Sequence, residues 1–144
     1  MQAVASSGQG VSPDEFRAVL GNALEELAAD ERAAPLLRAA GLSLRLEVTD
    51  LDVTVTVRAG DDAPAGLTWS FDDDDPVRLA LWMDSETANG YLQGSQSLAI
   101  GIARGRVRCS GESRVALAFL PLMRFVAEPY RREVHAHHPE LILA

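Results

Sequence analysis

The chain has 144 residues, which is long enough for one domain that buries about two thirds of the surface of its unfolded state. Its formal net charge is −8, and all 13 basic residues are arginines because no lysine occurs. Such an acidic chain is a poor nucleic-acid binder, and we expect anionic membrane surfaces to repel it. The single cysteine, Cys109, excludes an internal disulfide and fits a reducing compartment. With neither a signal peptide nor an apolar run of roughly 18 residues, the sequence predicts a cytoplasmic protein that does not insert stably into membranes.

The N-terminal part predicts a leader followed by two helices. Residues 1–11 are small and polar, which indicates a flexible leader. Ser12, Pro13 and Glu15 form a helix start with a capping residue, a proline at the first helical position and a glutamate that reaches back. Apolar residues at helical spacing follow, at positions 16, 20, 23, 24 and 27. A short second helix is expected over Pro35–Ala40, before Gly41.

The middle of the chain predicts a sheet. Alternating apolar and polar residues over 42–48 and 53–57 indicate an antiparallel hairpin, and 67–71 repeats the pattern in a third strand. The segment Val77–Met83 is apolar on both sides except at Arg78, so we expect both of its faces to be covered. A short fifth strand is expected over Arg106–Ser110. The predicted fold is α+β, with one mostly antiparallel five-stranded sheet covered by helices.

Residues 77–120 carry a series of short motifs in a fixed order. Asp84 or Ser85 can cap a helix that stops near Gly94, a short apolar helix follows over 98–103, and Gly105 and Gly111 flank the fifth strand. This order resembles the lipid-binding domain of the sterol carrier protein 2 (SCP2) family. The matching motifs are Met83-Asp84-Ser85, Leu92-x-Gly94, Gly105-Arg106-Val107-x-Cys109-x-Gly111 and the apolar Val115–Leu120.

The resemblance implies a particular architecture. It implies one SCP2-like domain, which we place at 12–134, followed by a C-terminal tail over 135–144. It also implies an apolar cavity for a lipid between the sheet and the helices. In the family the segment corresponding to 98–103 borders this cavity, which makes Leu98, Ile100 and Ile102 candidate ligand contacts.

The segment 115–126 is the best functional clue that the residues themselves give. Only Arg124 is polar there, whereas a helix on a sheet normally shows a polar outer face. More protein, a partner subunit or a ligand must therefore cover its second face, and Pro121 is expected to kink or restart the helix. Trp69 fits either the core or a ligand wall. The full set of candidate ligand-binding residues is Trp69, Leu81, Met83, Leu92, Leu98, Ile100, Ile102, Leu117, Phe119, Leu120, Met123 and Phe125.

Catalytic and metal-binding signals are weak. Cys109 lies beside arginines in a predicted strand, where a buried structural thiol is favoured over a reactive one. His135, His137 and His138 are interpreted as a frayed or surface tail in preference to a metal cluster. The run Asp72–Asp75 lacks the ligand spacing of a calcium loop and is interpreted as a solvated turn. No cofactor motif or nucleophile–histidine–acid set is present, so no catalytic residue, cofactor or metal is predicted.

The leading hypothesis is a non-enzymatic carrier or lipid-binding protein. It would hold a sterol, a fatty acyl chain or a similar apolar molecule, with no nucleic-acid partner. One alternative is a cofactor-independent enzyme that uses the cavity to steer an apolar substrate, for which Glu112, Glu128 or Tyr91 would have to point into the cavity. The other is an accessory module that forms a homodimer through the last helix.

Overall fold

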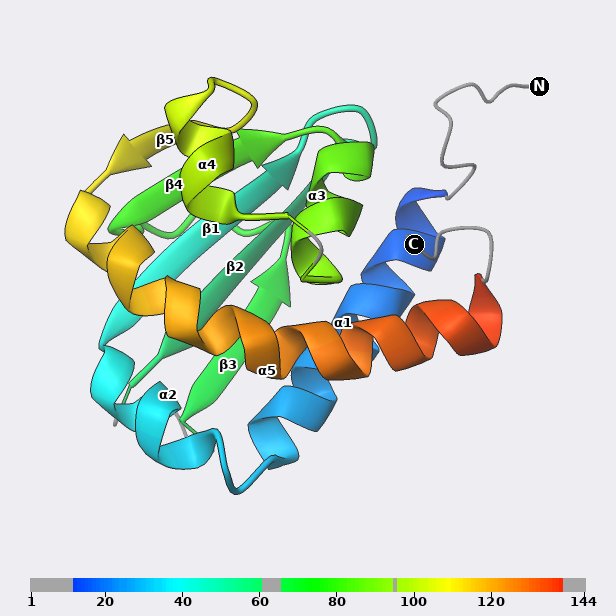
Figure 1. Ribbon diagram of the computed structural model, residues 1–144, viewed down its shortest axis with the longest axis horizontal. Coiled ribbons are helices and arrows are strands. Elements are labelled where there is room, and N and C mark those ends of the chain that lie inside the picture. Colours follow the sequence, from blue (N-terminus) through cyan, green and yellow to red (C-terminus); the bar gives the residue numbers. More distant parts are fainter. Residues whose placement is uncertain (1–11, 61–65, 95, 139–144) are drawn as a thin grey trace.

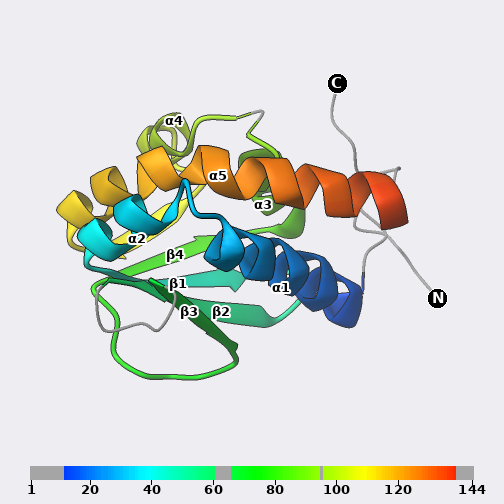
Figure 2. The same ribbon diagram turned by 90° about the horizontal axis from the view of Figure 1, so that it is seen from below.

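The structure is a computed structural model that describes residues 12–60, 66–94 and 96–138, with side chains except those of 113–124. All the helices in this part of the chain lie on one face of a single sheet (Figures 1 and 2). The helices are α1 (Pro13–Ala29), α2 (Ala34–Ala40), α3 (Ser85–Leu92), α4 (Leu98–Ala103) and α5 (Ser113–His137). The strands are β1 (Leu42–Val48), β2 (Val53–Ala59), β3 (Leu67–Phe71), β4 (Leu79–Met83) and β5 (Arg108–Gly111).

The sheet has five strands in the order β3-β2-β1-β4-β5. Three of the pairings are antiparallel, and the central pairing of β1 with β4 is parallel. This arrangement confirms the predicted α+β class and the mostly antiparallel sheet. The parallel pairing brings Leu46 beside Leu81, and the antiparallel hairpin brings Leu46 opposite Val55. Apolar side chains of the hairpin and of the distant strand β4 therefore meet at the centre of one face.

The helix starts follow from local hydrogen bonds. The Glu15 N–H donates to Ser12 Oγ at 3.1 Å, and the Ser12 N–H donates to Glu15 Oε1 at 2.9 Å, which confirms the predicted capping box. Asp84 caps α3 by accepting the Thr87 N–H at 2.8 Å. Asp50, from the turn between β1 and β2, accepts the Ser85 N–H at 2.8 Å as well. These bonds fix the start of α3 against the end of the hairpin.

The outer face of the sheet is polar and partly covered by the connection from β3 to β4, which passes beneath the sheet in Figure 2. Asp73 accepts hydrogen bonds from the hydroxyls of Ser70 and Thr56, the latter at 3.1 Å, and from the Arg45 guanidinium at 3.4 Å. Arg58 donates to the carbonyl of residue 76 at 3.1 Å. Thr56 is only 1% exposed. The acidic run is therefore anchored across the sheet, and its interpretation as a solvated turn is wrong for Asp73.

The carboxylate of Asp73 should make stability depend on pH. Its pKa is lowered by the Ser70 hydroxyl, with further lowering by the Asp75 N–H, Thr56 and Arg45. Because the folded pKa lies below the unfolded value of about 3.9, this contribution is present above about pH 4 and is lost as the pH falls through the folded pKa. We expect Asp73→Asn to lose less stability than the parent between pH 5 and pH 3, by a modest amount because solvent screens these groups. Urea midpoints at both pH values test this, with the exposed neighbour Asp74→Asn as control. Equal pH slopes for the parent and Asp73→Asn would contradict it.

Other expectations are corrected by the structure. The segment Val77–Met83 is not covered on both faces, because Trp82 is only half-buried on the outer face, where Arg108 lies 5.1 Å from the centre of its ring. Cys109 is exposed on the edge strand β5 and is not a buried thiol. The helix does not restart at Pro121, since α5 is continuous to His137 and enters the segment that we expected as a tail.

Candidate functional site

The candidate site is an apolar cavity between the sheet and the helices. Its floor is the inner face of β1, β2 and β4, together with the first residue of β3. Leu46 marks the centre of this floor. It lies on the middle strand of the sheet, yet it is only partly buried, whereas Leu44 and Val48 on the same face are 3% and 0% exposed. The helix layer thus fails to close fully over Leu46. The residues of the floor are Leu42, Leu44, Leu46, Val55, Val57, Ala59, Leu67, Leu81 and Met83.

The remaining walls come from the helices. On α1, leucines at helical spacing project from one face onto the sheet. α3 and α4 close another side, and the second half of α5 crosses between them and α1 (Figure 1). The residues that these helices and α2 contribute are Leu20, Leu24, Leu27, Leu37, Ala88, Tyr91, Leu92, Leu98 and Val126.

The cavity is small in this structure. Its volume is about 60 Å³, less than half of the about 150 Å³ of an apolar cavity that accepts benzene. Its lining is apolar, so a water molecule inside would find few hydrogen-bond partners. The cavity therefore favours an apolar group over water. A long acyl chain or a sterol can enter only if the helices move away from the sheet.

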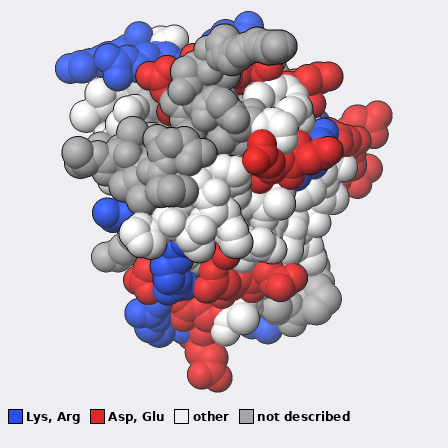
Figure 3. Space-filling model, turned by 90° about the vertical axis from the view of Figure 1, so that its right-hand side faces the viewer, with Lys and Arg blue, Asp and Glu red and all other residues white. Residues whose placement is uncertain are grey.

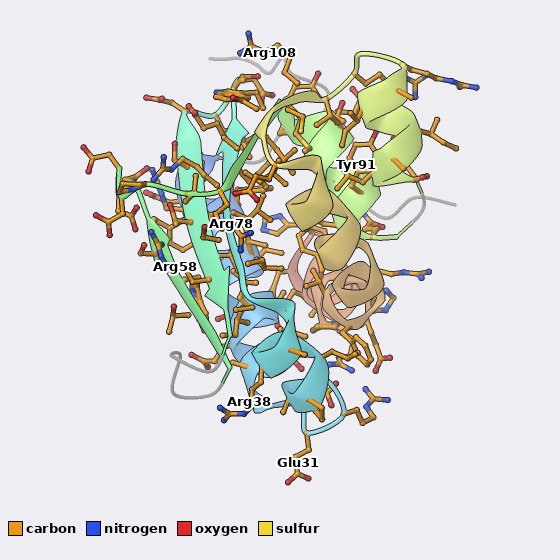
Figure 4. All side chains as sticks on the ribbon, turned by 90° about the vertical axis from the view of Figure 1, so that its left-hand side faces the viewer. Glu31, Arg38, Arg58, Arg78, Tyr91 and Arg108 are labelled. Atoms are coloured by element: carbon orange, nitrogen blue, oxygen red, sulfur yellow. The ribbon has the colours of Figure 1, made fainter. Side chains whose placement is uncertain are left out.

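Among the described residues of the lining, Tyr91 alone carries a side-chain hydroxyl. The residue is 3% exposed and its ring lies between the cavity and α4. A Cβ atom at Gly101 would lie 1.7 Å from the Tyr91 hydroxyl oxygen. Gly101 therefore provides the space into which this hydroxyl extends, and the end of the cavity depends on the contact between α3 and α4 (Figure 4).

The candidate residues taken from the sequence fall into three groups. Leu81, Met83, Leu92 and Leu98 line the cavity. Trp69, Ile102 and Phe125 are half-buried against the core and are not among the lining residues, and Ile100 is 51% exposed. The side chains of Leu117, Phe119, Leu120 and Met123 lie outside the described part of the structure. A role in ligand contact remains a prediction for every residue of the set.

Several lining residues were not among the candidates. Leu46 and Val55 belong to the hairpin, and Leu20 and Leu24 belong to α1. The sequence does mark them as inward-facing, through alternation in the strands and helical spacing in α1. Those patterns do not distinguish a side chain packed against protein from one that faces a cavity.

The three ionisable residues considered for an enzymatic role do not all lie at the cavity. Glu112 accepts two hydrogen bonds from the Arg78 guanidinium, at 3.0 and 3.1 Å, and Glu128 pairs with Arg132 at 3.2 Å. Neither glutamate is among the lining residues, whereas Tyr91 is. Over the ranges 12–60, 66–94 and 96–138, no group of three potential metal ligands occurs. Within the same ranges, no helix has the length and apolar character needed to cross a bilayer.

Comparisons with known proteins agree on the architecture. No protein-family model matches the sequence, and neither does any curated protein sequence. Among solved structures, a conserved hypothetical protein of Thermus thermophilus, described as possibly a sterol carrier protein, matches with a TM-score of 0.63 and 16% identity over 89% of this chain and 92% of its own. Sterol carrier protein 2 of Aedes aegypti, in complex with palmitate, matches with a TM-score of 0.53 and 14% identity over 74% and 92%.

The fold also occurs as part of a larger protein. A stereoselective inverting sec-alkylsulfatase of Pseudomonas sp. matches with a TM-score of 0.58 and 17% identity over 80% of this chain. The matched region is 17% of the length of that alkylsulfatase. The similarity to structures of sterol carrier protein 2 extends over nearly their whole length, and this chain has the sterol carrier protein 2 fold.

Proposed function

We propose that the protein binds an apolar small molecule, such as a fatty acyl chain or a sterol, in the cavity above Leu46 and acts as a lipid carrier or lipid-binding protein. The observation that carries this proposal is an apolar cavity at the centre of the sheet, where a close-packed core would bury Leu46 fully. Support also comes from the shared fold, because the Aedes aegypti protein with this fold is known in complex with palmitate.

The driving force would be the burial of methylene groups. At about 0.8 kcal/mol for each methylene, a chain that buries about fourteen of them gains roughly 11 kcal/mol before the costs of association and ordering. Opening the helix layer need not expose apolar surface to water, because the ligand replaces the helix–sheet contacts that are lost. Because these costs remove several kcal/mol, we expect micromolar affinity and broad selectivity.

Tyr91 would contribute apolar surface to the ligand site. Its ring lines the cavity together with Leu46, Leu81 and Leu98, whereas its hydroxyl extends toward Gly101 on α4. A buried polar group on a ligand would cost about 1–3 kcal/mol if it found no partner. The part of the proposed ligand that enters the cavity is therefore expected to be hydrocarbon.

Titration with a fluorescent fatty acyl probe, together with native mass spectrometry before and after organic extraction, tests this function. We expect saturable micromolar binding at one site per chain and release of an apolar mass on extraction. Absence of both saturable binding and a released mass would contradict the proposal. A stable ligand-free dimer would instead favour the accessory module.

A further inference from the structure

The inner face of the sheet is open to solvent at the edge strand β5. Cys109 lies directly opposite Leu81 in the pairing of β5 with β4, so both side chains project from the same face of the sheet, about 5 Å apart. Leu81 lines the cavity and is 2% exposed, whereas Cys109 is exposed, as are all four residues of β5. One strand spacing therefore separates the cavity from solvent at this edge.

The helix beside this edge, α4, buries few side chains (Figure 1; Figure 4 shows this side of the molecule). α1 and α3 each bury six residues, whereas α4 buries Leu98 and Gly101. Leu98 lines the cavity, and Gly101 lies against the Tyr91 hydroxyl. Movement of α4 away from the sheet would therefore cost less apolar burial than movement of α1 or α3.

The hydrogen bonds of α4 are all local. Among the residues that the structure describes, no hydrogen bond or ion pair of α4 reaches beyond residues 97–107. α3 is held differently, because its first N–H donates to Asp50 in the hairpin turn and Asn89 accepts the Tyr130 hydroxyl of α5 at 3.0 Å. α4 can thus move without breaking a hydrogen bond to another helix or to the sheet.

The other side of the helix layer, where α1 lies against α5, is closed by polar contacts. Asn22 Nδ2 donates to Glu133 at 2.9 Å, and Arg132 pairs with Glu26 at 2.6 Å. Seen from the right-hand side of Figure 1, the surface carries charged side chains of both signs (Figure 3). An apolar chain that entered between α1 and α5 would have to break these contacts and pass charged groups.

We propose that the ligand enters and leaves the cavity between α4 and the inner side of β5, with α4 as the lid of this route. The route rests on the proposed function, because it names the path to that site. Movement of α4 withdraws Leu98 from the cavity and opens the space next to Cys109, while the floor and α1 keep their places. Cys109 marks the mouth of the route by its position, and its thiol takes no part in binding.

A bulky group on Cys109 should obstruct this route. Because the chain has a single cysteine, a polyethylene glycol maleimide labels this position alone. In stopped-flow measurements with a fluorescent fatty acyl probe, the label should slow association and dissociation by at least about five-fold each. The dissociation constant should change by less than about two-fold, because both directions use the same route and Cys109 is not among the lining residues.

The matched control is Cys109→Ser/Ser110→Cys, labelled with the same reagent. Ser110 is exposed as well, but it lies opposite Ala80 on the outer face of the sheet. We expect the labelled control to match the rates of the unlabelled parent. Unchanged rates with the label at Cys109, or equal slowing by the two labels, would overturn the route while the proposed function stands. A parent without saturable binding would contradict the proposed function itself.

Nuclear magnetic resonance relaxation dispersion of the ligand-free protein tests the lid without a ligand. Lid motions occur on the microsecond to millisecond timescale that this experiment detects. We expect exchange broadening at the amides of α4 and of Cys109, and none at Leu20 and Leu24 in the centre of α1. Broadening confined to α1 or to α5, with α4 rigid, would overturn the assignment of α4 as the lid.

Discussion

Leu46→Trp is expected to weaken the binding of a fatty acyl probe by at least about ten-fold, equivalent to about 1.4 kcal/mol. Leu46 lies on the central strand at the floor of a cavity of about 60 Å³, and the larger indole would occupy the volume that the ligand has to use. The site sits on a strand paired on both sides, so the floor cannot move away as the helices can. Overpacking should cost about 1–3 kcal/mol of stability, which leaves a folded protein if the parent is as stable as an ordinary domain.

Thr68→Trp is the matched control for this variant. It adds the same side chain at an exposed position on the opposite face of the sheet. We expect it to bind the probe with the affinity of the parent. Because it gains one tryptophan, as Leu46→Trp does, the protein fluorescence of the two variants should be comparable. Parent-like binding by Leu46→Trp would mean that the ligand does not occupy the cavity, and the proposed site would then be wrong.

Gly111→Ala is expected to cost more than about 3 kcal/mol of stability, the largest effect that we predict for one methyl group. Gly111 has a φ of 122°, and a Cβ atom there would lie 2.1 Å from the carbonyl oxygen of Arg78. That carbonyl has little freedom to retreat. The Arg78 N–H donates to Ser43 Oγ at 2.8 Å, and its guanidinium donates to the Gly41 carbonyl at 2.8 Å. The variant should therefore disrupt the pairing of β5 with β4, as measured by urea unfolding.

Gly105→Ala separates the steric clash from backbone strain. Gly105 also has a positive φ, 77°, but no atom lies within 4 Å of its hypothetical Cβ. We expect this variant to lose only the about 1–2 kcal/mol that the left-handed conformation costs a residue with a side chain. Equal losses for the two variants would contradict the account of Gly111.

The sequence predicted the elements of this fold better than their arrangement. The cap at Ser12, a cap at Asp84 or Ser85 and the hairpin depend on residues close together in the chain. The Ser12 cap and the hairpin are confirmed, and the structure selects Asp84 as the second cap. The parallel pairing of β1 with β4 depends on segments separated by more than thirty positions, and no local pattern specifies it. The anchoring of Asp73 by Arg45 depends on the same long-range arrangement.

The candidate site was only partly predictable, for a related reason. Leu98 and Leu92 were candidates and line the cavity, whereas Leu46 and Leu24 line it without having been candidates. A leucine that packs against protein and one that faces a void have the same local pattern. The difference depends on how far the helices stand from the sheet, which is a property of the assembled layers. Exposure at Ile100 was missed because apolar residues on a short helix were assigned to the cavity as a group.

The proposed function requires that a ligand enters the space above Leu46. An isotope-filtered nuclear Overhauser experiment on the protein with ¹³C-labelled palmitate tests this most directly. The account predicts cross-peaks from the chain methylenes to the methyl groups of Leu46 and Leu81 and to the ring of Tyr91. Cross-peaks confined to exposed residues such as Ile100, or saturable binding with no contact to Leu46, would contradict it.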